Sequence, residues 1–204
     1  MEGVFQTLKG GGVMMVPLLF CSVLLIALAI ERLWTLRKLN DDGDELIGTV
    51  RSTWNQGPEK TIQACSEFRG ALGRVFIRGL KNSGRTAEAI EMALEQEAAN
   101  ELPGLEANLP VIKTIVNIAP LLGLLGTIVG MISAFRVASQ AGLSNPSQIL
   151  GGISEALIST FTGISIAVIG FIIYNYFANQ SKKIIEDIEY YGAELVNLLT
   201  DRVD

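Results

Sequence analysis

Residues 119–131 have the sequence APLLGLLGTIVGM, which is apolar enough to cross a bilayer and yet contains three glycines and a threonine. Gly123, Gly126 and Gly130 fall on one face of a helix, and Ala134 continues that face. Glycine weakens a helix relative to alanine, so a helix that only lies in lipid gains nothing from it. Helices that pack closely in a membrane do gain, because small residues let their backbones approach. The stretch therefore predicts a membrane helix packed against protein, with its hydroxyl facing a neighbour or a pathway.

The composition agrees with a membrane protein. Hydrophobic residues make up 49% of the 204 residues but aromatic residues only 7%, so most of the hydrophobic side chains are small and aliphatic. The charges cluster and leave three uncharged windows, residues 10–30, 114–135 and 156–181. Each window exceeds the roughly 18–20 apolar residues that a helix needs to span the hydrocarbon core. No small-residue cleavage site follows the first window, so we expect a retained helix rather than a signal peptide. The predicted fold is an all-α membrane protein with three transmembrane helices.

Basic residues beside the windows predict the orientation in the membrane. One side has six of them, Arg32, Arg37, Lys38, Lys113, Lys182 and Lys183, whereas the other has only Lys9 and Arg136. The N-terminus is therefore expected outside, with the large loop and the C-terminus in the cytoplasm. The predicted order is an outer N-terminal segment (1–12), transmembrane helix one (13–32), a cytoplasmic helical loop (33–108), transmembrane helix two (109–136), a short outer loop (137–148), transmembrane helix three (149–179) and a cytoplasmic C-terminal helix (180–204).

Several function classes are disfavoured. The chain has no histidine and two isolated cysteines, Cys21 and Cys65, which fall in different compartments, so neither a disulfide nor a metal site is expected. Nucleophile–histidine pairs cannot form, and no phosphate-binding loop occurs, so we predict no enzyme activity and no cofactor. A net charge of -5 argues against nucleic acid as a partner.

The loop is predicted to be helical. Pro58 fits the first turn of one helix. A second covers 68–80, with Leu72, Val75, Phe76 and Leu80 on one face. Thr86 is a suitable N-cap for an acidic third helix, which Pro103-Gly104 or Pro110 would bend. The charges of the loop fit a solvated face best, and a basic patch that contacts anionic membrane lipid is the alternative.

The C-terminal segment continues the third window as an amphipathic helix. Its apolar stripe recurs at steps of three and four residues, at Ile184, Ile188, Tyr191, Leu195 and Leu198. Such a stripe must be buried, either on the loop helices or on copies of the same chain, so an oligomer is a natural inference.

Glu155 stands at the start of the third window. Ser159 and Thr162 share its helix face, with Ser165 at the edge, whereas Thr160 points about 140° away from Glu155. Two interpretations stay open. Hydroxyls in membrane helices often bond their own backbone, which is a structural role. A polar stripe that begins with a carboxylate instead indicates an ion or proton route, because ionisable groups in membranes are costly.

Two motifs carry a resemblance to a known family. The stretch APLLGLLGTIVG at 119–130 and the stretch GISEALIST at 152–160 resemble the MotA/TolQ/ExbB proton-channel family, and the ExbB and TolQ branch fits best. The two motifs in this order and spacing are specific, although either alone would be weak. The Glu31-Arg32 pair that ends the first span adds to the resemblance.

The resemblance implies a multi-pass subunit of the bacterial inner membrane that forms a pentameric ring, with its outer side in the periplasm. Spans two and three would line a pore around the transmembrane helix of a smaller ExbD/TolR-like protein, which carries the proton-binding aspartate. Thr127 and Thr160 match the pore hydroxyls of the family, Glu155 matches its acid, and Ser159 and Thr162 are weaker candidates. Energy from proton flow would pass to a TonB- or TolA-like transducer.

The sequence departs from the family in one place and leaves two alternatives. Ile169 stands where the family often has a proline in span three, so a bend there is not expected. Three spans rather than four disfavour a flagellar stator. A membrane scaffold whose polar residues only join helices, or a stand-alone ion channel, are the alternative functions.

Overall fold

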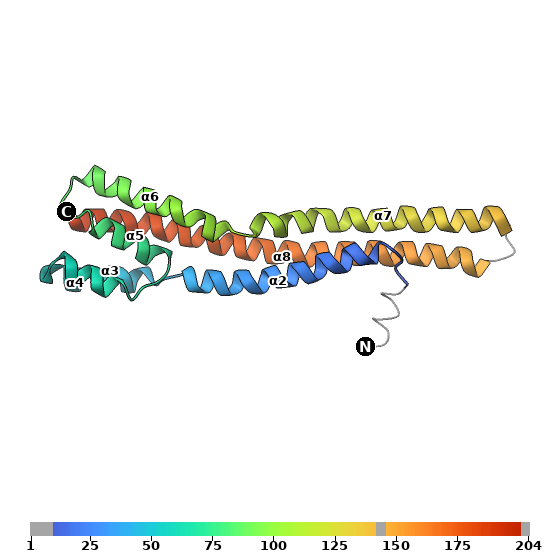
Figure 1. Cartoon of the computed structure of the whole chain (residues 1–204), viewed down its shortest axis with the longest axis horizontal. Helices are drawn as coiled ribbons and strands as arrows, with labels where there is room; N and C mark the ends of the chain where they lie inside the picture. The colour runs from blue at the N-terminus through green and yellow to red at the C-terminus, as the bar shows by residue number, and fades with distance from the viewer. Residues whose placement is uncertain (1–9, 142–145, 201–204) are drawn as a thin grey trace. The chain divides into compact units, whose positions relative to one another are not determined.

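The computed structural model describes residues 10–141 and 146–200. Lys9, the centre of the predicted outer loop at 142–145 and the end of the predicted C-terminal helix at 201–204 lie outside the described residues. The described part is helical and has no strand, which confirms the all-α prediction. Its elements are α2 (Met15–Leu39), α3 (Gly43–Thr53), the 3-10 helix η1 (Trp54–Gln56), α4 (Pro58–Cys65), α5 (Ala71–Leu80), α6 (Ala87–Glu106), α7 (Leu109–Ala141) and α8 (Pro146–Leu199) (Figure 1).

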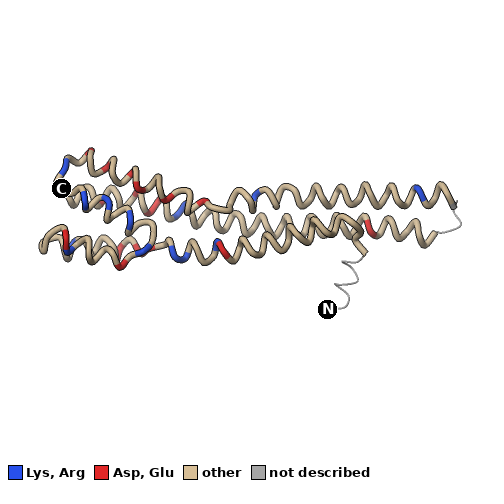
Figure 2. The backbone as a smooth tube through the Cα atoms, viewed as in Figure 1, with Lys and Arg blue, Asp and Glu red and all other residues tan. Residues whose placement is uncertain are grey.

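The chain divides into two compact units, which we call the apolar unit and the charged unit. The apolar unit comprises Met1–Ile30 and Asn108–Asn175, and the charged unit comprises Glu31–Ala107 and Tyr176–Asp204. Among the described residues of the apolar unit, only Lys113, Arg136 and Glu155 are charged. The other described charges lie in the charged unit, on α3 to α6, in the turns that join these helices and on the C-terminal parts of α2 and α8 (Figure 2).

Three helical stretches are long and apolar enough to cross a membrane, and they cover α2, α7 as far as Gln140, and α8. Large apolar side chains on these helices are exposed, including Phe20, Phe135 and Phe161 at 68%, 66% and 74%. Exposing such side chains to water is unfavourable, whereas lipid or another protein chain accommodates them. The three predicted transmembrane helices are therefore confirmed in length and composition.

Helix starts in the charged unit follow the predicted capping residues. Pro58 lies in the first turn of α4, and the hydroxyl of Thr86 accepts a hydrogen bond from the Ala89 amide at 3.4 Å, as predicted. The second predicted helix begins at Ala71 rather than at residue 68. Asp41 explains this start, because its carboxylate accepts bonds from the amides of Gly70 and Gly73 at 2.9 and 2.8 Å.

The predicted bend near a proline is replaced by a break. Helix α6 continues past Pro103 and ends at Glu106, and α7 begins at Leu109. Asn108 between them has a φ of 61°, a left-handed conformation that asparagine tolerates better than most residues. Pro110 then lies in the first turn of α7, where a missing amide costs no helical hydrogen bond.

Two buried side chains donate hydrogen bonds to backbone carbonyls at the end of α6. Arg32, 2% exposed, donates to the Gly104 carbonyl at 3.0 Å and also pairs with Glu31. Ser181 on α8, 3% exposed, donates to the Leu105 carbonyl at 2.8 Å. The last carbonyls of a helix have no partner inside it, so these two bonds join α2 and α8 to α6.

The C-terminal stripe packs inside the charged unit. Ile184, Ile188 and Leu195 are buried, and the Tyr191 hydroxyl donates to Asp44 of α3 at 2.7 Å. The stripe is therefore buried on the loop helices, which was the first of the two predicted possibilities. The stripe no longer argues for contacts between copies of the chain.

Candidate functional site

The hydroxyls of Thr127 on α7 and Thr160 on α8 contact each other. Thr160 also donates to the Gly123 carbonyl at 3.0 Å. The Thr127 oxygen lies 3.4 Å from the carbonyl oxygens of both Gly123 and Ala156, a long distance for a hydroxyl donor. Two hydroxyls from different helices thus meet in a partly buried place of the apolar unit.

Small residues on both helices allow this meeting. On α7, the Gly123, Gly126 and Gly130 face predicted from the sequence lies against α8, and Ala134 is buried beside Gly152. A Cβ atom at Gly123 would lie 3.0 Å from the Thr160 Cα, and one at Gly130 would lie 2.8 Å from the Gly152 carbonyl oxygen. The small-residue face therefore packs two helices of the same chain, and it gives no argument for contacts between copies.

A complementary face on α8 was not identified from the sequence. Gly152, Ala156, Ser159 and Gly163 recur at steps of four, three and four residues, which places them on one side of a helix. A Cβ atom at Gly163 would lie 2.5 Å from the Ala119 carbonyl oxygen. This spacing could have revealed the face from the sequence, because it resembles the spacing of the small residues on α7.

Ser159 and Glu155 face a different neighbour from Thr160. Ser159 is fully buried and donates to the Gly11 carbonyl at 2.7 Å. The Glu155 carboxylate lies against Gly12, where a Cβ atom would overlap it. Gly12 has a φ of 68°, a conformation that suits glycine. The segment before α2 therefore covers the acidic end of the predicted polar stripe, a contact that the sequence did not indicate.

Thr162 and Ser165 bond their own helix. The Thr162 hydroxyl donates to the Ile158 carbonyl and the Ser165 hydroxyl to the Phe161 carbonyl, each at 2.8 Å. Both are bonds to the carbonyl four residues earlier, the structural role that hydroxyls often have in membrane helices. The structure thus brings Thr127 and Thr160 together, places Ser159 and Glu155 at the Gly11–Gly12 segment, and leaves Thr162 without a contact to another helix through its hydroxyl.

The charged unit shows shifted pKa values with local causes. Burial raises the pKa of the Cys65 thiol to about 11. The hydrogen bond to Asp44 raises the pKa of Tyr191 to about 12. The hydrogen bond to Glu101 raises the pKa of Arg74. Within the described residues, no group of three or more Cys, Asp or Glu side chains could hold a metal ion.

Comparison with known proteins decides the family. The profile of the MotA/TolQ/ExbB proton channel family matches residues 68–190, which include α5, α6, α7 and most of α8. The chain belongs to the MotA/TolQ/ExbB proton channel family. An ExbB-like biopolymer transport protein of Synechocystis sp. is 34% identical over 170 residues, 82% of this chain and 81% of the relative.

Further relatives place the chain in the ExbB and TolQ branch. A biopolymer transport protein ExbB homolog of Methanothermobacter thermautotrophicus is 26% identical over 188 residues, 91% of this chain and 67% of the relative. The Tol-Pal system protein TolQ of Pseudomonas aeruginosa is 30% identical over 116 residues, 57% of this chain and 50% of the relative. This is a family of transport and channel proteins rather than of enzymes, and its member described here is a membrane protein of the proton-channel and energy-transduction type.

Proposed function

We propose that this chain forms a ring in the inner membrane, most simply a homopentamer, around the transmembrane helix of an ExbD/TolR-like single-span protein. The N-terminus lies in the periplasm and the C-terminus in the cytoplasm. The ring converts the proton motive force into work on a TonB- or TolA-like transducer. The observation that carries this proposal is the contact of Thr127 with Thr160, two uncharged polar groups inside a unit with a single described acid.

The hydrogen bonds of the two threonines fit a proton relay to a partner carboxyl group. Each hydroxyl has one proton to donate. If Thr160 donates to the Gly123 carbonyl, Thr127 can donate to Thr160, and both protons are then used within the chain. The Thr127 oxygen keeps its capacity to accept, so a protonated carboxylic acid can donate to it. A carboxylate instead requires one hydroxyl to rotate away from its partner in the chain, so protonation and hydroxyl orientation are coupled.

Glu155 is proposed to act at the periplasmic entrance. It is the only described acid of the apolar unit, it is half-buried, and it lies against Gly12 before α2. A carboxylate there attracts protons and other cations toward the pore. On the cytoplasmic side, the exposed basic residues that flank the spans, Arg37, Lys38 and Lys183, contact anionic membrane lipid.

Co-expression with a single-span ExbD/TolR-like protein from the same organism tests this function. We expect native mass spectrometry to show a pentamer of this chain with the partner bound, and proteoliposomes of the complex to take up protons. A stable monomer, or no proton uptake by the complex, would refute the proposal. Proton uptake by this chain alone would favour a stand-alone channel.

One observation favours a scaffold as the second candidate. Each candidate hydroxyl already has a hydrogen-bond partner inside the chain, for example Ser159 with Gly11 and Thr162 with Ile158. A scaffold needs these bonds only for packing. The double variant Thr127→Val and Thr160→Val keeps the side-chain shape and removes both hydroxyls. Normal proton-driven transport by an assembled double variant would favour the scaffold.

A further inference from the structure

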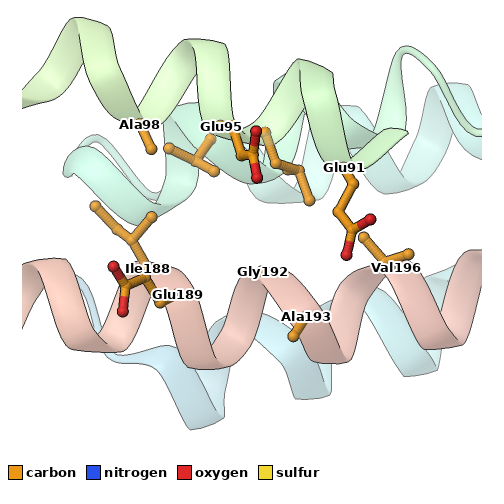
Figure 3. A pocket seen from close by; sticks show the side chains of 10 residues that line it. Glu91, Glu95, Ala98, Ile188, Glu189, Gly192, Ala193 and Val196 are labelled. Carbon is orange, nitrogen blue, oxygen red and sulfur yellow. The ribbon is translucent and has the colours of Figure 1, made fainter. Parts of the chain in front are cut away.

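The charged unit contains a groove between α6 and α8 that the proton pathway does not use (Figure 3). It has a volume of about 190 Å³ and is also lined by α5. Its apolar lining consists of Val75, Leu94, Ala98, Ile188, Ala193 and Val196. An apolar groove of this size can hold one or two aliphatic side-chain stems, such as those of lysine or arginine.

Three carboxylates surround the groove, Glu91 and Glu95 from α6 and Glu189 from α8 (Figure 3). All three are exposed, and none takes part in an ion pair among the residues that the structure describes. The apolar lining with acidic groups at its edge complements a cationic side chain with a long aliphatic stem.

The same unit has an exposed basic cluster. Arg78, Lys81 and Arg85 lie at the end of α5 and in the turn before α6. In the described part of the chain, no ion pair involves any of them. Arg74, one turn earlier on α5, does pair with Glu101, whereas Arg78, Lys81 and Arg85 remain available to another molecule.

The groove and the basic cluster lie at the same level of the helices. A Cβ atom at Gly79 would lie 2.7 Å from the Leu94 side chain and 3.0 Å from the Leu195 side chain, so α5, α6 and α8 meet there. Arg78 and Glu95 are the sequence neighbours of Gly79 and Leu94. In a ring whose axis runs along these helices, two surfaces at the same level can meet between adjacent copies.

We propose that the groove of one copy binds Arg78 and Lys81 of the adjacent copy, with their stems on the apolar lining and their charges at Glu91, Glu95 and Glu189. This is a head-to-tail contact between two different surfaces, the kind that closes into a ring. The inference rests on the proposed ring. It adds a contact outside the membrane that fixes which surfaces of adjacent copies meet.

Crosslinking in the full-length protein tests the contact. In a Cys21→Ala background, Glu95→Cys and Arg78→Cys are combined, and a short bis-maleimide is added to the detergent-solubilised protein. Native Cys65 is buried and is kept. We expect a ladder of covalent multimers on denaturing gels. Either cysteine substitution alone gives no ladder, and neither does the matched pair of Glu67→Cys with Arg78→Cys, because Glu67 is an exposed acid outside the groove.

Charge reversal identifies the interaction. Adding Glu91→Lys to the crosslinking pair should abolish the ladder, and adding Lys81→Glu as well should restore it. Native mass spectrometry of the same samples tests the ring separately from the contact between the groove and the basic cluster. A ring without a ladder, or a ladder that neither reversal changes, overturns the contact and leaves the ring intact. A monomer overturns both. Protection of the thiol at position 95 from labelling only when the single-span protein is co-expressed assigns the groove to that partner and overturns the contact between copies.

Discussion

Replacing Gly163 by alanine should weaken the packing of α7 on α8. The added Cβ atom would lie 2.5 Å from the Ala119 carbonyl oxygen and 3.1 Å from the Gly123 Cα atom. Both are backbone atoms, so the helices themselves must move apart. Overpacking of a close contact costs about 1–3 kcal/mol. Alanine also favours the helix over glycine by about 0.5–1 kcal/mol, which offsets part of this cost.

Gly151→Ala on the same helix is the matched control. Nothing lies within 4 Å of a Cβ atom at Gly151, so this variant gains the helix preference without any overpacking. The difference between the two alanine variants therefore isolates the packing term, and we expect Gly163→Ala to be less stable than Gly151→Ala by about 1–3 kcal/mol. Unfolding in mixed detergent, followed by circular dichroism, measures this difference. Equal stability of the two variants would refute the close packing of α7 on α8.

Three further predictions concern the charged unit. Ser181→Ala leaves the buried Leu105 carbonyl without its hydrogen bond and should cost about 1–3 kcal/mol in the same unfolding experiment, whereas an unchanged stability would show that water replaces the hydroxyl. The Cys65 thiol is fully buried and has a pKa of about 11, so in native protein at pH 8 it should resist a maleimide that labels it after unfolding; rapid native labelling would contradict its placement. The pKa of Tyr191 is raised to about 12 in the folded protein from about 10 unfolded, so the stabilisation by its bond to Asp44 is complete below pH 10 and is lost as the pH rises to 12. The unfolding temperature of Tyr191→Phe should therefore fall less steeply over this pH range than that of the unmodified protein. Parallel curves of unfolding temperature against pH would argue against the bond.

Much of the fold follows from local features of the sequence. Uncharged windows identify α2, α7 and α8 as membrane helices because the length that spans a bilayer is a property of one segment. Caps such as Thr86 and first-turn prolines such as Pro58 act within a few residues of the helix that they begin. The glycine face of α7 likewise predicted close packing, and the two motifs that contain Thr127 and Thr160 indicated the family.

The remaining features depend on contacts between distant segments. The start of α5 is set by Asp41, which is 29 residues before Gly70, and the end of α6 by Arg32 and Ser181. No local pattern reveals such long-range hydrogen bonds. The same holds for Ser159, whose bond goes to Gly11 before the first span. Helix geometry alone put it on the Glu155 face, and only the fold shows which segment covers that face.

Proton uptake by the assembled complex with Thr160→Val, compared with Thr162→Val, tests the central claim most directly. The two threonines are two residues apart on α8, but Thr160 contacts Thr127 and the Gly123 carbonyl on α7, whereas Thr162 bonds only the Ile158 carbonyl of its own helix. In proteoliposomes with an imposed pH gradient, we predict that Thr160→Val loses proton uptake and Thr162→Val keeps it, with both rings intact by native mass spectrometry. Unimpaired uptake by an intact Thr160→Val ring would contradict the account.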